Sequence, residues 1–456
     1  MEGITALDYI LLPFYLWLIY RVAYYYRDKF YPEGHAYRPY FIPGLTAKIF
    51  GAIFISMFYW YYYGGGDSYT FFVHSRVINS TFLSAPDTWL RLMTHQADDQ
   101  NLTDSMALSQ MYWYNDVASY TVARVGAFLG LFCFTQYLII NVLVAVISFN
   151  GIWLLFICFA QQYTHLIKKI AIAILFMPGP TVWGSGLYKD SLCMFAIGCL
   201  CYSAYILFEK KNFRFILIVL LIISILLLVF IKAYIIAMLL PAMILKIILV
   251  YKKKTSARFG GRVKFYILLG IMSIGAVFAA KKIISSITIT PEDVIETIQH
   301  QKDYLLRVSL AQDGSAYNLG DFDPSINGIL KMFIPAVNVT LFRPYPWESK
   351  SLIQLFNSSE STGVLLLTLY LLFTRNPFKT LKNIYTDPNL IMCLTFTLLF
   401  AFIVGVSTYN FGSLSRYKIP CTPFYMLFLM ILIFKDKPEA KTLETLEEPA
   451  LNHPLT

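Results

Sequence analysis

Long apolar runs separated by short polar connections are the main pattern along the chain. The run at 215–230 reads FILIVLLIISILLLVF and holds no charged side chain. About 20 apolar residues in a helix cross the ~30 Å hydrocarbon core of a bilayer, whereas a membrane β-barrel shows weak alternation over segments of about ten residues. The pattern predicts an all-α integral membrane protein of about 11 transmembrane helices, in a range of roughly 10 to 12.

The apolar runs set the expected boundaries of these spans. We expect them at 7–25, 45–63, 136–160, 168–183, 190–208, 213–231, 234–250, 264–280, 358–374, 389–407 and 419–434. The stretch 119–135 is also apolar, but a crossing there would place Lys168 and Lys169 outside. We therefore expect it to be an interfacial helix.

Composition and charge narrow the class and the location. A hydrophobic share of 57% and a charged share of 14% exclude an ordinary soluble globule. The net charge of +10 comes mainly from basic clusters between apolar runs, such as the one at 252–264. This is the positive-inside pattern of cytoplasmic loops and not a nucleic-acid surface. It predicts a bacterial inner (cytoplasmic) membrane protein with its N-terminus outside and its C-terminus in the cytoplasm.

Two segments between the basic clusters are expected on the extracytoplasmic face. The segment 64–120 carries six Asp against two Arg, and 281–357 is close to charge-balanced. We therefore expect one membrane domain, 1–436, with these two outer loops. The polar stretch 437–456 is expected to be a disordered cytoplasmic tail.

The strongest local signal is YYYGGGDSYTFF at 61–72, where an expected span reaches the outer surface. Its three glycines allow backbone conformations that other residues avoid, so a substrate can come close. Asp67 follows directly, and a carboxylate at the membrane edge can act as the general base for a sugar hydroxyl or bind a metal. The structural alternative is a turn in which Asp67 is the N-cap of the next helix.

A second motif, MPGPTVWGSGLYKDS at 177–191, interrupts the apolar pattern with Pro and Gly at the outer boundary. Irregular backbone at membrane depth is tolerated only where protein covers it or a wet cavity lies beside it. Lys189 and Asp190 are expected to start the next helix, whose N-terminus beside Lys189 suits an anionic phosphate. The alternative is a capped tight turn.

Lys232 interrupts a long apolar stretch at the expected outer turn between two spans. An ionisable residue at such a position is a candidate ligand for an anionic substrate. The alternative is that its side chain snorkels to the membrane interface.

The late outer segment holds VNVTLFRPYPWES at 337–349. Two prolines, Pro344 and Pro346, stiffen this stretch. Arg343 offers a fork-shaped cation, Trp347 an indole for stacking on carbohydrate, and Glu348 a carboxylate. We interpret the set as a candidate for sugar or pyrophosphate recognition, with catalytic roles for Arg343 and Glu348.

The stretch SLSRYKIPCTP at 413–423 places Arg416 and Lys418 at the expected outer entry to the last span. Basic residues there run against the positive-inside tendency. We therefore interpret Arg416 and Lys418 as candidate contacts to phosphate.

Metal and cofactor motifs are missing from the sequence. The six histidines and seven cysteines show no ligand spacing, and no P-loop or GxSxG motif occurs. No cofactor or metal site is predicted, although a divalent metal stays open. The predicted partners are a lipid-linked sugar and the bilayer, without nucleic acid.

The motifs GLYKDS and RYKIPCTP, an Asp outside an early span and a large late outer loop together resemble enzymes that use polyprenyl-phosphate-linked sugars. The layout is similar to GT-C-type glycosyltransferases and to O-antigen or exopolysaccharide polymerases of the EpsG kind. The sequence segments GSAYNLGDFDP and VNVTLFRPYPWE also resemble segments of multi-span envelope proteins common in Bacteroidota. The resemblance implies that Asp67 matches the first outer acid of the GT-C pattern, and that Arg343 and Arg416 match outer-loop arginines of polymerases.

The predicted function is transfer or polymerisation of sugars from polyprenyl-(di)phosphate-linked donors at the extracytoplasmic face, for envelope or exopolysaccharide synthesis. A transporter or flippase for lipid-linked glycans is the main alternative, although few ionisable residues fall within the expected spans. A non-enzymatic envelope assembly protein is a third.

Overall fold

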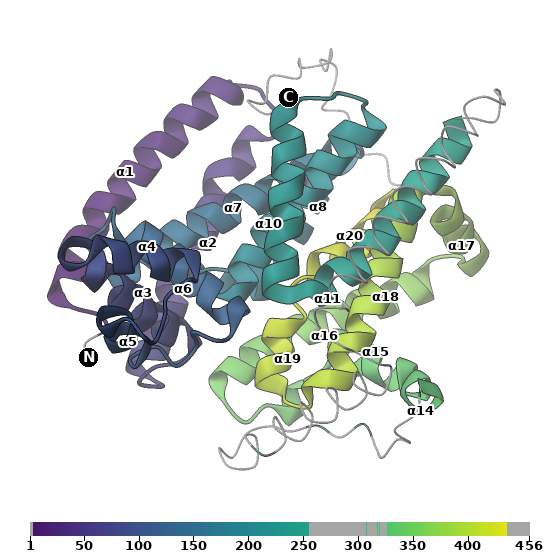
Figure 1. Cartoon of the computed structure of the whole chain (residues 1–456). Coiled ribbons are helices and arrows are strands. Elements are labelled where there is room, and N and C mark those ends of the chain that lie inside the picture. Colours follow the sequence, from purple (N-terminus) through teal and green to yellow (C-terminus); the bar gives the residue numbers. More distant parts are fainter. Residues whose placement is uncertain (1–2, 255–306, 308–316, 318, 320–325, 436–456) are drawn as a thin grey trace. The chain divides into compact units, whose positions relative to one another are not determined.

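The computed structural model describes residues 3–254, 307, 317, 319 and 326–435 (Figure 1). Over these residues the chain is helical and forms no strand. The helices of the first half are α1 (Ala6–Phe30), α2 (Arg38–Tyr61), α3 (Asp67–Ser84), α4 (Pro86–Thr94), α5 (Leu102–Leu108), α6 (Val117–Gly130), α7 (Tyr137–Ala160), α8 (Ile167–Leu175), α9 (Pro178–Val182) and α10 (Lys189–Ala204). The later ones are α11 (Phe215–Lys254), α14 (Ile326–Lys331), α15 (Phe333–Phe342), α16 (Leu352–Thr374), α17 (Pro377–Thr386), α18 (Pro388–Thr408), α19 (Phe411–Tyr417) and α20 (Thr422–Phe434).

Six of the described helices are long and apolar enough to cross a membrane. They are α1, α2, α7, α10 with its π-helical extension to Glu209, α11 and α18. The bent pair α19 and α20, with 67° between its helices, brings the number to seven if it is one span. The chain is therefore a membrane-embedded helical protein, as predicted, while the expected count of about 11 is not reached by these helices.

Two compact units divide the described residues, one that ends at Ala233 and one that begins at Tyr234. Helix α11 contributes to both, and its backbone leaves the helical conformation at Lys232, with φ −149° and ψ 77°. The sequence predicts two spans with a turn here, and the turn is reduced to this single non-helical residue. Glycine and proline, which would lengthen such a turn, are absent from the residues around Lys232.

The centre of the first unit is α7, which is apolar on all sides and packs against α2 and α10. Small residues let two of these helices come close. A Cβ added at Gly198 of α10 would lie 1.8 Å from the carbonyl oxygen of Gly151 in α7. Such close backbone approach increases the van der Waals contact between two helices. This contact stabilises helix pairs in a membrane, where the hydrophobic effect does not drive helices together.

A buried carboxylate joins the starts of α1 and α7. Asp8 is fully buried, and its oxygens accept hydrogen bonds from the backbone N–H of Thr5 at 2.9 Å and of Leu138 at 2.8 Å. A carboxylate at a helix N-terminus satisfies orphan N–H groups and favours the helix dipole. Because one side chain serves both N-termini, α1 and α7 start at the same end of this unit, which agrees with their expected relative direction.

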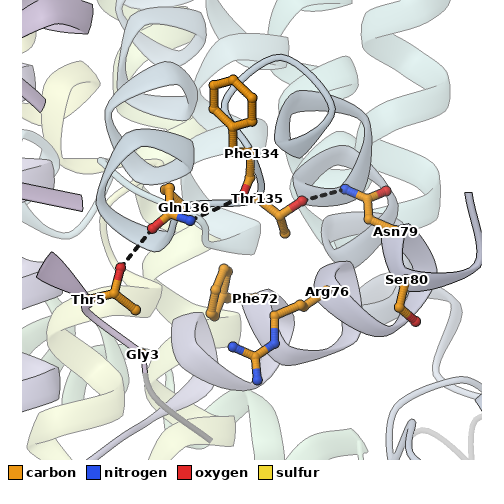
Figure 2. Close-up of a pocket in the computed structure, with 9 residues that line it drawn as sticks. All are labelled: Gly3, Thr5, Phe72, Arg76, Asn79, Ser80, Phe134, Thr135 and Gln136. Carbon is orange, nitrogen blue, oxygen red and sulfur yellow. Dashed lines mark hydrogen bonds between the residues drawn. The ribbon is translucent and has the colours of Figure 1, made fainter. Parts of the chain in front are cut away.

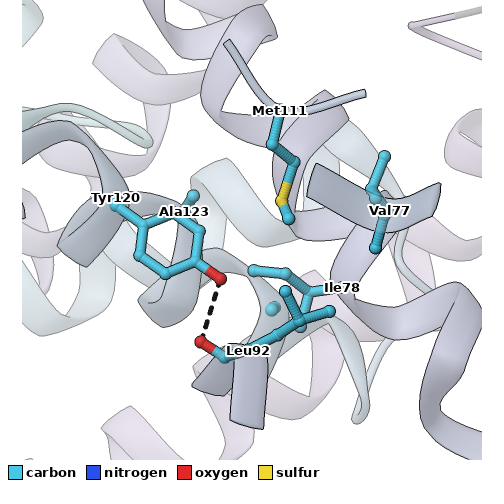
Figure 3. Close-up of a cluster of buried hydrophobic side chains, with 8 residues drawn as sticks. Val77, Ile78, Leu92, Met111, Tyr120 and Ala123 are labelled. Carbon is cyan, nitrogen blue, oxygen red and sulfur yellow. Dashed lines mark hydrogen bonds between the residues drawn. The ribbon is translucent and has the colours of Figure 1, made fainter. Parts of the chain in front are cut away.

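The segment predicted as an outer loop at 64–120 is instead mostly helical. Helices α3, α4, α5 and α6 enclose a small apolar core of their own, in which Ile78, Leu92 and Tyr120 are fully buried (Figure 3). The Tyr120 hydroxyl donates to the carbonyl of Leu92 at 2.9 Å. The expected interfacial helix at 119–135 corresponds to α6, which packs against α3.

The expected span at 168–183 is wrong as a single helix. It is divided into α8, which ends at Leu175, and the short α9, which begins at Pro178. Met177, directly before this proline, has an extended backbone with ψ 127°. The proline ring disfavours helical geometry in the preceding residue, so the break follows from the sequence.

The second unit packs α15 against α18, and α18 against α20. Helix α16 is longer than the expected span at 358–374, and its first half is polar, with Gln354 and Glu360 among its residues. This polarity keeps α16 outside the group of clearly apolar helices above. The expected span at 264–280, most of the outer loop at 281–357 and the tail at 437–456 lie outside the described residues.

Candidate functional site

The three glycines before α3 adopt the unusual backbone that the sequence indicates. Gly64, Gly65 and Gly66 have φ of 68°, 152° and 143°, a region that disfavours other residues. Gly66 is the N-cap of α3, so the alternative that Asp67 is the N-cap is wrong. Asp67 is the first residue of the helix, and its side chain is exposed.

The GLYKDS turn meets the start of α3 at a buried asparagine. Asn141 of α7 is fully buried, and its Oδ1 accepts from the backbone N–H of Leu187 at 2.7 Å and from the hydroxyl of Ser68 at 3.1 Å. Ser68 follows Asp67 in the chain, and Leu187 precedes Lys189 by two residues. One side chain of the central helix therefore fixes both motifs at one end of the first unit.

An aromatic ring supports the same arrangement. A Cβ added at Gly66 would lie 2.5 Å from Cδ1 of Tyr59, so the glycine backbone rests on this ring. The centroids of Tyr59 and Tyr188 are 6.2 Å apart. Tyr59 thus lies between the residue before Asp67 and the residue before Lys189. In the sequence, Asn141 looks like any other polar residue of an apolar helix. Tyr59 looks like any other aromatic residue near the end of a membrane span.

Lys189 begins α10, as predicted, and pairs with Asp116 of the predicted outer segment. Its Nζ lies 3.2 Å from Asp116 Oδ2, and the two side chains are 25% and 38% exposed. Asp116 also caps α6, accepting from the N–H of Ala118 at 3.0 Å and the hydroxyl of Ser119. Burial acts to raise the pKa of Asp116, but the Ser119 hydrogen bond and the Lys189 charge outweigh it and lower the pKa.

Asp190 and Lys232 form a separate, buried ion pair. Lys232 Nζ lies 2.5 Å from Asp190 Oδ1, and the side chains are 8% and 1% exposed. The alternative that Lys232 snorkels to the interface is therefore wrong. A buried carboxylate compensates this ammonium where the helical hydrogen-bond ladder of α11 is interrupted.

Lys48 is a buried cation that the sequence analysis did not identify as a candidate. It lies within α2, is 2% exposed, and donates to the carbonyls of Pro180 at 2.8 Å and Gly184 at 2.7 Å. A longer bond of 3.3 Å reaches the hydroxyl of Ser148. The broken segment around α9 leaves these carbonyls without helical partners, and the ammonium satisfies them.

In the second unit, Arg343 and Glu348 form an ion pair. The guanidinium is bound to the Glu348 carboxylate, which also accepts from the N–H of Tyr345 at 2.8 Å. The guanidinium carbon lies 5.1 Å from the ring centroid of Phe411 and 6.0 Å from that of Tyr317. Burial acts to raise the pKa of Glu348, but Arg343 and the Tyr345 N–H lower it overall.

An aromatic pair, half-buried Tyr345 and exposed Trp347, lies beside this ion pair. Tyr345 and Trp347 stack with 4.9 Å between centroids and 22° between planes. Trp347 is 80% exposed, so most of the indole is open to contact. An exposed and pre-stacked indole next to charged groups suits contact with the apolar face of a sugar ring.

Lys418 is buried beside Arg343 and does not lie at an exposed entrance to the last span. It is 5% exposed, and its ammonium donates to the hydroxyl of Ser361 at 2.7 Å and the carbonyl of Arg343 at 3.4 Å. Arg416 is half-buried in the last turn of α19. The predicted residues are therefore divided between the two units, with Asp67, Lys189, Asp190 and Lys232 in the first, and Arg343, Trp347, Glu348, Arg416 and Lys418 in the second.

Within the described ranges, no three His, Cys, Asp or Glu side chains are grouped as a metal site requires. Comparison with known proteins supplies no family for this chain. No protein-family model matches it, and neither the curated proteins nor the solved structures that were searched include a similar chain.

Proposed function

We propose that the chain transfers or polymerises sugars from polyprenyl-(di)phosphate-linked donors. The observation that supports this most is the meeting of the GGGDS and GLYKDS motifs at Asn141, which holds an exposed carboxylate and an accessible cation at one end of the first unit. A lipid-diphosphate donor needs a base for the acceptor and cations for the leaving group, and both lie here.

Asp67 is assigned the role of general base. Its carboxylate takes the proton from an acceptor hydroxyl, the hydroxyl oxygen forms a bond to the anomeric carbon, and the bond from that carbon to the phosphate oxygen breaks. The polyprenyl diphosphate leaves with the electron pair of that bond. The exposed position at the first residue of α3 leaves room for both reactants.

Lys189 is assigned to the diphosphate. Its pair with Asp116 is partly exposed, at 25% and 38%, so an anionic group can reach the ammonium. Asp190 and Lys232, at 1% and 8% exposure, are too buried for direct contact with a substrate and are reassigned to positioning α10 and α11. In the second unit, Trp347 with Tyr345 is assigned to sugar stacking and Arg343 with Glu348 to polar contacts beside it.

The proposal includes the finer expectations from the sequence. The reaction takes place at the extracytoplasmic face of a bacterial inner membrane, and the complete chain has about 11 spans in a GT-C-like arrangement. The substrate reaches the site from the bilayer, so the apolar surfaces of the helices are part of its path.

The test uses the purified full chain reconstituted in lipid vesicles. Polyprenyl-diphosphate-linked oligosaccharides extracted from the source cells are added, and products are analysed by mass spectrometry. The expected result is a new glycosidic bond together with free polyprenyl diphosphate. Intact substrate across the whole extracted pool would overturn the proposal.

Transport is the second candidate, and the α8–α9 break favours it. Transporters use broken helices whose freed carbonyls coordinate a cation, and here the Lys48 ammonium contacts the carbonyls of Pro180 and Gly184. Movement of the lipid-linked glycan between leaflets without a new product, in the same vesicles, would support transport in place of transfer.

A further inference from the structure

A cavity of about 270 Å³ in the first unit has a wall whose polar side chains bind one another (Figure 2). The Asn79 amide donates to the Thr135 hydroxyl at 3.0 Å, and the Thr5 hydroxyl donates to Gln136 Oε1 at 2.9 Å. These bonds stabilise the link between α6 and α7. The second unit differs, because one of its helices, α17, has an apolar face that is exposed.

Helix α17 joins α16 to α18 and is amphipathic. Phe378, Leu381 and Tyr385 recur at the spacing of three and four residues that places side chains on one face of a helix. All three are exposed, Phe378 at 84%, and none of the ten residues of α17 is buried. Lys379 and Lys382 lie on the adjoining face, and the stretch 377–386 holds no acidic residue. The described helices of this unit therefore leave the apolar face of α17 open.

Contacts between helix ends hold α17 at one end of the second unit. Arg375, the C-cap of α16, donates to the carbonyl of Ile433 in the last turn of α20. Lys435 follows α20, and its ammonium lies 2.9 Å from Oδ2 of Asp387, the N-cap of α18. The end of α16, the start of α18 and the end of α20 therefore meet. Because α18 is long and apolar enough to span a bilayer, α17 lies at the level where a span reaches the membrane surface.

The surface of α17 fits one kind of partner. Leu372 and Phe373, in the last turn of α16, are also exposed, so the apolar surface of α16 continues along the chain into α17. A basic amphipathic helix beside a span suits the headgroup layer of a membrane leaflet that is rich in anionic lipids. We propose that α17 lies in this layer, with Phe378, Leu381 and Tyr385 among the acyl chains and Lys382 bound to anionic phospholipid headgroups.

The position of the apolar face is tested on the full chain in lipid vesicles. The seven native cysteines are all buried, so Leu381→Cys and Asn383→Cys each offer one accessible thiol for a nitrobenzoxadiazole label. Two positions separated by two residues lie about 200° apart around a helix. We expect spin-labelled lipid to quench the label at 381 at least about threefold more strongly than the label at 383, and aqueous iodide to do the opposite.

The anionic preference is tested with the label at 381 and two spin-labelled lipids, phosphatidylglycerol and phosphatidylcholine. One lysine near an anionic surface changes the affinity by about fivefold, so phosphatidylglycerol should reach half quenching at about one fifth of the phosphatidylcholine concentration or less. Lys382→Gln should lower this preference by about fivefold. Lys350→Gln is the matched control and should leave the preference unchanged, because this exposed lysine precedes the start of α16, at the opposite end of that helix from α17.

The inference does not rest on the proposed sugar transfer, because lipid contact is measured without a sugar donor or acceptor. Equal quenching of the two labels by lipid would overturn the interfacial position of α17. A label at 381 that is shielded from both lipid and iodide would show a protein partner on this face and would overturn it as well. Equal quenching by the two lipids, or an unchanged preference in Lys382→Gln, would overturn the binding of anionic headgroups. A thermal unfolding curve for each variant confirms that the fold is intact.

Discussion

Two buried lysines of the first unit lie at breaks in helical structure, and they are neutralised in different ways. Lys48 contacts neutral oxygens, namely the carbonyls of Pro180 and Gly184 and the hydroxyl of Ser148. Lys232 contacts the carboxylate of Asp190. At α9 the break itself supplies carbonyl oxygens to the lysine, whereas at Lys232 a carboxylate from another helix pairs with the ammonium.

The largest expected effect is the loss of the carboxylate. Asp190→Ala removes the carboxylate that lies 2.5 Å from the buried Lys232 ammonium, and breaking a buried ion pair in this way costs about 3–5 kcal/mol in the free energy of unfolding. Thermal or denaturant unfolding in detergent measures it. The double variant Asp190→Leu with Lys232→Met removes both charges, so it should recover most of the loss. A double variant as unstable as Asp190→Ala would contradict this account.

A smaller loss is expected at the other lysine. Lys48→Met keeps the length of the side chain but leaves the carbonyl of Pro180 without this donor, at a cost of roughly 1–3 kcal/mol, while the carbonyl of Gly184 keeps the Ser148 hydroxyl at 2.8 Å. No buried charge is left behind, so the cost should be below that of Asp190→Ala in the same assay. Hydrogen exchange should show the opening at 177–186 first. If Lys48→Met is the more damaging variant, the comparison of the two lysines fails.

The ion pair between Asp104 and Arg91 lies outside the spans, so it offers a comparison for the two buried lysines. Asp104 is buried and accepts two hydrogen bonds from Arg91 at 2.7 Å, and this contact lowers the pKa of Asp104 to about 2. Because the pKa is lowered on folding, the stabilisation is complete above the ordinary value near 4 and is lost as the pH falls toward 2. Hydrogen exchange within 88–104 should rise over this window, and Arg91→Gln should move the rise to higher pH.

The smallest expected effect is in the second unit. Ser361→Ala removes the neutral partner of Lys418 at 2.7 Å, while the carbonyl of Arg343 remains as an acceptor. The Ser361 hydroxyl also donates to the carbonyl of Asn357 at 3.1 Å, so two hydrogen bonds are lost and the free energy of unfolding should fall by roughly 1–2 kcal/mol. Ser359→Ala, at an exposed hydroxyl of the same helix, is the matched control and should have no measurable effect.

Apolar runs predicted most of the described spans because a bilayer permits few solutions for the backbone. Helices α1, α2, α7, α10 and α18 follow the expected ranges within a few residues at most of their ends. The failures have local causes. Pro178 ends a helix that hydropathy alone continues, and a polar first half makes α16 longer than its apolar stretch. The helices of 64–120 were missed because their small core is scattered through a polar segment.

The candidate site was predictable only as separate motifs. Glycine conformations at 64–66 and the helix start at Lys189 follow from residue types. Their meeting does not, because Asn141 looks like any polar residue within an apolar helix until its two partners are known. The sequence also offers no signal that Lys232 has a carboxylate partner 42 residues earlier in the chain.

The most direct test of the proposed catalytic role compares two aspartates in the reconstituted transfer assay. Asp67 and Asp87 are both exposed and both lie in the first turn of a helix, so their effects on helix stability should be similar. We predict that Asp67→Asn lowers kcat by about 100-fold or more, as expected for a lost general base, and that Asp87→Asn stays within about twofold of the unmodified protein. Equal rates for the two variants would contradict the assignment of Asp67 and the site built around it.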